Sequence, residues 1–336
     1  MTSSIKTINL AGFGNTGVTA LCDFLTDFDE FDGFLPRVHE GGYVKSDIRF
    51  LSLFKSSGLS MRSEFADLTI DDLADSITGS SGRFKERYTA RGFGEQGHLK
   101  NRAQMVNQKI IGESELRSVI KLLNRDLECN ARGLLPEYVP EAKITVAFEK
   151  FKTAIVKAHH RNNIAEKRPQ PKVLFFKNDP PAALPDVSCL LFDRSIFICR
   201  EPTDTTYDLL RHYGMDVTTA NVKWHIKAYK NALTSFISRL EAREDINFTE
   251  RLRIVQFSDF VEKSAVRTEV VRFALSDSSL SNLNATSAKF NANNSKKNIG
   301  HGSSLSTSDQ NLIRREIQPY YDFFIEKLKT HGLIFQ

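Results

Sequence analysis

A glycine-rich turn near the N-terminus carries the residues whose types and spacing first suggest chemistry. The stretch NLAGFGNTGVTAL, residues 9–21, places Gly12, Gly14 and Gly17 in a G-x-G-x-x-G pattern between an apolar segment and a helix-like one. At such a turn, free backbone N–H groups and the dipole of the following helix attract an anion. The stretch therefore predicts a phosphate-binding turn, with a purely structural strand–helix connection as the alternative.

Two well-known phosphate-binding patterns match this turn only in part. A dinucleotide site has an acidic residue about 20 positions beyond the glycines, at the end of a second strand. Asp29 and Glu30 lie near that distance, but residues 27–38, DFDEFDGFLPRV, make a poor strand. A nucleoside triphosphate site has a lysine directly after the last glycine, where this chain has Val18. ATP or GTP hydrolysis is therefore disfavoured, and an NAD(P)-dependent oxidoreductase stays an alternative.

The turn resembles the phosphosulfate loop of the sulfotransferase family, whose pattern is basic–Ser/Thr–Gly–Ser/Thr–Thr. In that family the loop wraps the 5′-phosphosulfate of 3′-phosphoadenosine 5′-phosphosulfate (PAPS), the donor co-substrate. Backbone N–H groups and two hydroxyls can hold such an anion without a metal ion. The resemblance implies that the donor is bound by Gly14, Asn15, Thr16, Gly17, Val18 and Thr19.

Two later segments resemble the same family in the same order along the chain. Residues 195–209, SIFICREPTDTTYDL, are similar to a strand-to-helix segment with the pattern Arg-x-Pro-x-Asp, in which the arginine contacts the nucleotide's 3′-phosphate. The resemblance gives that role to Arg200. Residues 294–313, NSKKNIGHGSSLSTSDQNLI, are similar to a late basic loop, from which Lys296 and Lys297 would close over the same phosphate.

Two positions depart from the family pattern. Asn15 stands where the family has a lysine or arginine that neutralises charge on the bridging oxygen as the sulfuryl group leaves. Asp208 stands where a serine would bind the 3′-phosphate, and a carboxylate there would repel it. We expect other cations to compensate, with a differently placed nucleotide and loss of activity as the alternatives.

A general base is needed near the acceptor hydroxyl for sulfuryl transfer. Residues 36–45, PRVHEGGYVK, supply Glu40 and His39 shortly after the first predicted helix. In relatives that act on carbohydrates the base is often a glutamate in this region. We therefore expect Glu40 to be the catalytic base, with His39 as the second choice and a solvated loop as the alternative for both.

Alternating strand and helix patterns must position these residues. Apolar runs rich in β-formers predict strands at residues 5–13, 171–179, 195–202 and 251–257. Helical patterns between and after them predict an α/β fold with a central parallel sheet flanked by helices. The family resemblance implies the P-loop-like architecture of the sulfotransferases. Ser258 is a candidate N-cap for one helix spanning 258–275, and Pro319 should bend a final helix at 308–331.

The remaining segments are predicted as parts of one domain spanning residues 1–336. Residues 41–170 contain helical pieces and few convincing strands, which indicates a mainly helical insertion on the acceptor side. Residues 276–307 are rich in serine and asparagine and predict a loop.

Composition narrows the class of protein. The hydrophobic fraction of 40% and charged fraction of 26% are ordinary for a globular protein, and a net charge of +5 is too small to indicate nucleic acid. Four scattered cysteines predict reduced core thiols. No signal peptide, long apolar span or H-E-x-x-H pattern occurs, so we expect a cytoplasmic protein with no integral membrane segment and no metal site.

The family resemblance implies a PAPS-dependent sulfotransferase of the bacterial carbohydrate type. It would move the sulfuryl group to a hydroxyl of a small-molecule or glycan acceptor. A non-catalytic nucleotide-binding protein of the same fold and the oxidoreductase remain alternatives.

Overall fold

The three-dimensional structure is a computed structural model of the whole chain. It describes residues 5–14, 16–33, 169–177, 185–212, 214–276 and 289–335, with scattered positions between 145 and 167. The predicted insertion at 41–170 therefore lies almost wholly outside the described residues.

A five-stranded sheet forms the centre of the fold, with the strand order β2-β3-β1-β4-β5. β1 pairs in parallel with β4, and β4 pairs in parallel with β5. This arrangement confirms the predicted α/β class with a central parallel sheet flanked by helices. The strands are β1 (Lys6–Gly12), β2 (Phe31–Gly33), β3 (Val173–Lys177), β4 (Arg194–Cys199) and β5 (Leu252–Gln256).

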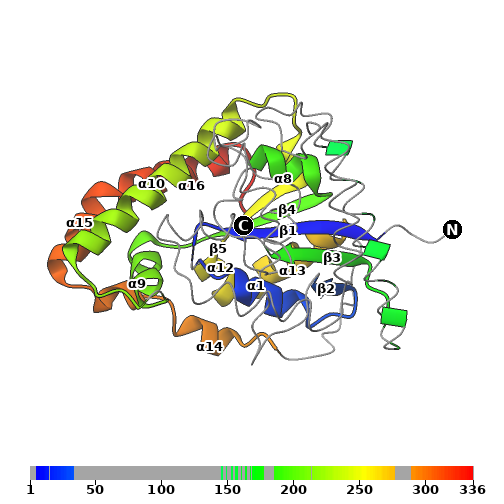
Figure 1. Cartoon of the computed structure of the whole chain (residues 1–336), viewed down its shortest axis with the longest axis horizontal. Helices are drawn as coiled ribbons and strands as arrows, with labels where there is room; N and C mark the ends of the chain where they lie inside the picture. Colours follow the sequence, from blue (N-terminus) through cyan, green and yellow to red (C-terminus); the bar gives the residue numbers. More distant parts are fainter. Residues whose placement is uncertain are drawn as a thin grey trace, which may run out of the picture. The chain divides into compact units, whose positions relative to one another are not determined.

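Helices connect and cover the strands (Figure 1). The long helix α10 lies beside α16, and α12 contacts both α13 and α14. The helices are α1 (Val18–Leu25), α8 (Pro185–Leu191), α9 (Pro202–His212), α10 (Thr219–Glu241), α11 (Phe248–Arg251), α12 (Phe257–Glu262), α13 (Ser264–Leu275), α14 (Ala292–Lys296), the 3₁₀ helix η3 (His301–Ser304), α15 (Thr307–Glu316) and α16 (Gln318–Thr330).

Alternating side chains of the strands are buried on the two faces of the sheet, as their period of two requires. Phe197 and Cys199 of β4 belong to a core cluster with apolar residues of α10 and α16. Ile196 and Ile198 are also fully buried but lie outside this cluster. Because both faces are covered, β4 reads as a continuous apolar run in the sequence.

Three local expectations need correction. Ser258 is not an N-cap, because α12 begins at Phe257 behind Gln256 and a second helix, α13, begins at Ser264. The final helical segment is two helices that meet at Ile317, with Pro319 in the first turn of α16, where proline is tolerated. The described part of the predicted loop at 276–307 contains the short helices α14 and η3.

The chain divides into two compact units. One unit comprises Lys6–Asp32 with Asn178–Gln336, and the other comprises Met1–Ile5 with Gly33–Lys177. A compact unit need not fold independently, so the single domain stays a prediction. Among the described helices, none is long and apolar enough to cross a membrane.

Candidate functional site

Three parallel strands end together at one edge of the sheet. Gly12 at the end of β1 lies opposite Ile198, and Cys199 at the end of β4 lies opposite Gln256 at the end of β5. The chain therefore leaves all three strands at the carboxyl edge, where open α/β sheets bind ligands. The glycine-rich turn, Arg200 and Phe257 follow the three strands directly.

The first residue of the turn is anchored in the core. The Phe13 ring packs edge-on against Phe236 and Phe324, with ring centroids 5.5 and 5.3 Å apart. The backbone N–H of Phe13 donates to the Thr16 hydroxyl at 3.2 Å, and Thr16 is almost fully buried. Thr16 thus closes the turn on itself, while Thr19, on the first turn of α1, is exposed.

Gly17 is the N-cap residue of α1 and has a left-handed backbone with φ of 105°. A Cβ atom at this position would lie 2.3 Å from a ring carbon of Phe257, so only glycine allows the turn to approach α12 this closely. Glycine also brings no side chain to the first N–H groups of the helix, and the first turn contains no acidic residue. These N–H groups and the helix dipole therefore attract an anion.

Arg200 lies just beyond β4 and is only 5% exposed. Its guanidinium donates to Asp208 at 2.5 Å and to the backbone carbonyl of Asn298. The Cζ atom sits 4.9 Å from the centroid of the Phe257 ring, in cation–π geometry. The Tyr229 hydroxyl of α10 fixes the main chain here by donating to the Arg200 carbonyl at 2.9 Å.

The Phe257 ring is therefore in contact distance of both the Gly17 turn and the Arg200 guanidinium. The two segments, almost two hundred positions apart in the sequence, lie together at the same edge of the sheet. This is the arrangement that a single phosphate-bearing ligand, held from both segments, would require.

Acidic side chains of α9 surround Arg200. Asp204 lies 3.8 Å from the guanidinium and accepts the backbone N–H groups of Gly302 at 2.7 Å and Gly300 at 2.9 Å. The second oxygen of Asp208 contacts His301 Nδ1 at 2.9 Å. Arg200, Asp204 and Asp208 thus join the end of β4, helix α9 and the turn at 298–302 into one polar cluster.

Residues 289–302 form a strap that two aspartates hold to the rest of this unit. Asp27, just after α1, accepts the backbone N–H groups of Lys289 at 2.7 Å and Phe290 at 3.0 Å. Asp204 holds the other end, where a Cβ on Gly302 would clash with Thr203 at 2.5 Å. Between these points α14 contacts α12, so the strap runs past the same edge (Figure 1).

The two lysines expected at the nucleotide lie at the end of α14 on this strap. Lys296 is exposed and lies 3.8 Å from Glu262, and Lys297 is exposed at the C-cap. Of the other predicted donor-binding residues, Gly14 has a positive φ of 89° and Val18 opens α1. Asn15 and both candidate bases, His39 and Glu40, lie outside the described residues.

Buried titratable groups near the edge are held in their neutral forms. Burial lowers the pKa of His225 to about 4, and its Nδ1 lies 2.8 Å from the Thr206 hydroxyl. Burial raises the pKa of Cys199 to about 12, and that of Tyr229 well above its ordinary value. These groups are therefore poor candidates for acid–base or nucleophilic chemistry near neutral pH. In the described ranges, no group of three or more His, Cys, Asp or Glu side chains could hold a metal ion.

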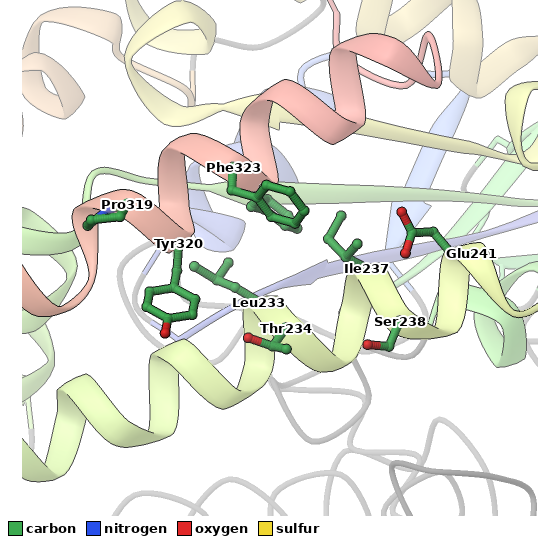
Figure 2. Close-up of a pocket in the computed structure, with 9 residues that line it drawn as sticks. Leu233, Thr234, Ile237, Ser238, Glu241, Pro319, Tyr320 and Phe323 are labelled. Atoms are coloured by element: carbon green, nitrogen blue, oxygen red, sulfur yellow. The ribbon is translucent and has the colours of Figure 1, made fainter.

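A concave surface feature lies between α10 and α16 (Figure 2). It is a groove of about 480 Å³ whose lining is mostly apolar, with Leu233 and Ile237 on one helix and Tyr320 and Phe323 on the other. Figure 2 shows Glu241 at one end of the groove. No residue of the glycine-rich turn or of α9 lines it.

Comparisons with known proteins give likenesses among solved structures. No protein-family model matches the chain, and no curated protein matches it. Among solved structures, the chain is similar to a sulfotransferase domain from the curacin biosynthetic pathway, with a TM-score of 0.42 and 14% identity. The similarity covers 82% of this chain and 75% of that one.

Sequence reasoning missed three residues of the site. Phe257 gives no sequence signal beyond being the last residue of a predicted strand, and only the packing of Gly17 reveals its role. Glu201 adjoins Arg200, and its carboxylate accepts a backbone N–H at the start of α9. His301 adjoins Gly300, and its ring contacts the Asp208 carboxylate. Both residues stand next to motif residues, which is the signal that could have identified them.

Proposed function

We propose that this chain is a sulfotransferase that moves the sulfuryl group from PAPS to a hydroxyl of a carbohydrate or glycan precursor. The observation that carries the proposal is that the Gly14–Thr19 turn and Arg200 lie at the same carboxyl edge of the sheet. Gly17 of the turn and the Arg200 guanidinium both lie against the ring of Phe257. The family resemblance assigns the 5′-phosphosulfate to the first segment and the rest of the nucleotide to the second.

In this proposal the N–H groups at the start of α1 and the Thr19 hydroxyl bind the 5′-phosphosulfate. They stabilise the negative charge that grows on the bridging oxygen as the sulfur–oxygen bond breaks. The acceptor hydroxyl oxygen forms the new bond to sulfur and its proton passes to a base, for which Glu40 is the first candidate and His39 the second. The nucleotide leaves as adenosine 3′,5′-bisphosphate (PAP).

A non-catalytic nucleotide-binding protein is the second candidate. Asp208 favours it, because this carboxylate already takes up the charge of Arg200. The oxidoreductase gains no support, since Asp29 and Glu30 precede β2 instead of following it at its carboxyl end, where ribose recognition takes place. A cytoplasmic location stays a prediction.

Nucleotide binding is the first test. We expect PAP to raise the melting temperature, while NADH and ATP leave it unchanged. Thr19→Val removes one exposed hydroxyl from α1 and should weaken PAP binding about tenfold, the loss of one charge-assisted hydrogen bond. Thr268→Val, at an exposed threonine of α13 whose hydroxyl donates to the Ser264 carbonyl, is the matched control and should bind PAP like the wild type.

Transfer is the second test. Radiolabelled PAPS with a panel of carbohydrate acceptors should yield a sulfated product, and Glu40→Gln should bind PAP normally while turning over slowly. Stabilisation by NADH equal to that by PAP would refute the proposal. Binding of PAP without transfer to any acceptor class would favour the binding protein.

A further inference from the structure

Of the helices that begin at the carboxyl edge, α1 and α9 differ in the charge of their first turns. The first turn of α1 has no acidic residue, and its N-cap is a glycine. At the start of α9, the Glu201 carboxylate accepts the backbone N–H of Thr203 at 2.7 Å and that of Asp204 at 3.3 Å. At α9, the N-terminal N–H groups that would attract an anion are therefore already bound by the chain's own Glu201. The N-terminus of α1 has no such carboxylate in its first turn and can bind an anionic ligand.

The other anion-attracting groups around α9 are also engaged by carboxylates of the chain. Asp204 accepts the N–H groups of Gly300 and Gly302, and Asp208 contacts both the Arg200 guanidinium and His301 Nδ1. These four groups come from the strap and from the residue directly after β4, and two aspartates of α9 engage all of them. The aspartates therefore occupy groups that a bound anion would otherwise use.

The charge balance of this cluster opposes a second anion. Two carboxylates, from Asp204 and Asp208, lie 3.8 and 2.5 Å from the guanidinium of Arg200. A phosphate brought to Arg200 would meet like charges at close range inside a partly buried cluster, where they are poorly screened. Of the two aspartates that reach Arg200, Asp208 is the more accessible, with its side chain 21% exposed against 8% for Asp204.

We infer that Asp208 takes the place of a second phosphate of the donor, so that the site binds a nucleotide 5′-phosphosulfate through that group alone. This inference rests on the proposed function and specifies which donors the site accepts. Adenosine 5′-phosphosulfate, which lacks the 3′-phosphate, is then as good a sulfuryl donor as PAPS. With the smaller donor, the acceptor oxygen bonds to sulfur, the sulfur–oxygen bond to the nucleotide breaks, the hydroxyl proton passes to the base, and AMP leaves. Asp208 is thus a specificity-determining residue.

The test compares the affinities of PAP and AMP by titration calorimetry in three full-length proteins. The wild type should bind PAP and AMP with dissociation constants within about threefold of each other. This ratio corresponds to less than half of the binding free energy of a tenfold preference. Asp208→Asn keeps an acceptor oxygen toward Arg200 and removes only the charge, so PAP should bind about tenfold more tightly while AMP is unchanged. Asp216→Ser, which removes an exposed carboxylate just beyond α9, is the control for net charge and should match the wild type.

Each outcome separates the inference from the proposed function. A wild-type preference for PAP of tenfold or more overturns the inference and leaves the proposed function standing. An unchanged PAP-to-AMP ratio in both Asp208→Asn and a second variant, Asp208→Ser, also overturns it. If neither nucleotide binds the wild type or either variant, the proposed function fails and the inference with it.

Discussion

Replacing Gly17 by alanine tests whether the glycine-rich turn lies against the Phe257 ring. The left-handed backbone, with φ of 105°, would cost an alanine about 1–2 kcal/mol. The new Cβ would also lie 2.3 Å from one ring carbon and 2.6 Å from the next, and relief of such overpacking costs a further ~1–3 kcal/mol. We therefore expect the free energy of unfolding to fall by about 2–5 kcal/mol.

Gly214 offers a matched control, because it too has a positive φ, 63°, but nothing within 4 Å of a Cβ placed there. Gly214→Ala should show the backbone cost alone. The difference between the two variants in urea unfolding measures the contact with Phe257, and Phe257→Leu combined with Gly17→Ala should recover part of it. Equal losses at Gly17 and Gly214 would refute the placement of the ring against the turn.

Two further predictions concern buried groups of α8 and α10. Burial lowers the pKa of His225 to about 4 from its ordinary 6.5, so between these pH values the unfolded chain binds a proton at this residue and the folded chain does not. The free energy of unfolding should therefore fall by up to about 3 kcal/mol as the pH is lowered from 6.5 to 4. His225→Gln should flatten this part of the pH profile in urea unfolding, and an unchanged slope would contradict the assignment. Arg239 makes a bidentate ion pair with Asp186, at 2.6 and 2.5 Å, with both residues buried. Either alanine variant alone should lose about 3–5 kcal/mol. The double variant should lose clearly less than the sum, and strict additivity in the cycle would argue against the pair.

Local patterns were sufficient to predict the elements that carry the site. The strand predicted at 195–202, closed by its proline, contains most of β4, and the helix predicted after it is α9, which begins at Pro202 itself. Both are readable without tertiary contacts, because a buried strand is a continuous apolar run. The same holds for the turn after β1. That Gly17 and Arg200 meet follows from parallel pairing, which brings successive carboxyl ends to one edge.

Long-range polar contacts could not be predicted in the same way. The hydrogen bonds from Gly300 and Gly302 to Asp204 join residues nearly a hundred positions apart, and their donors are backbone groups that carry no sequence signal. Asp208 was noticed as a departure from a pattern, but its pairing with Arg200 and His301 depends on the path of the strap. The sequence placed the lysines near the site and did not indicate that Lys296 faces Glu262.

The strap is held at both ends through its main chain, since Asp27 and Asp204 each accept two backbone N–H groups from it. Arg200 likewise donates to a backbone carbonyl of the strap. Mutations that change side chains along residues 289–299 therefore leave these tethers intact, whereas loss of either aspartate releases one end. Apart from Phe290, whose ring packs against Phe24 and Phe260, exposed positions such as Lys296 and Lys297 can therefore change the charge of this rim while its attachment stays constant.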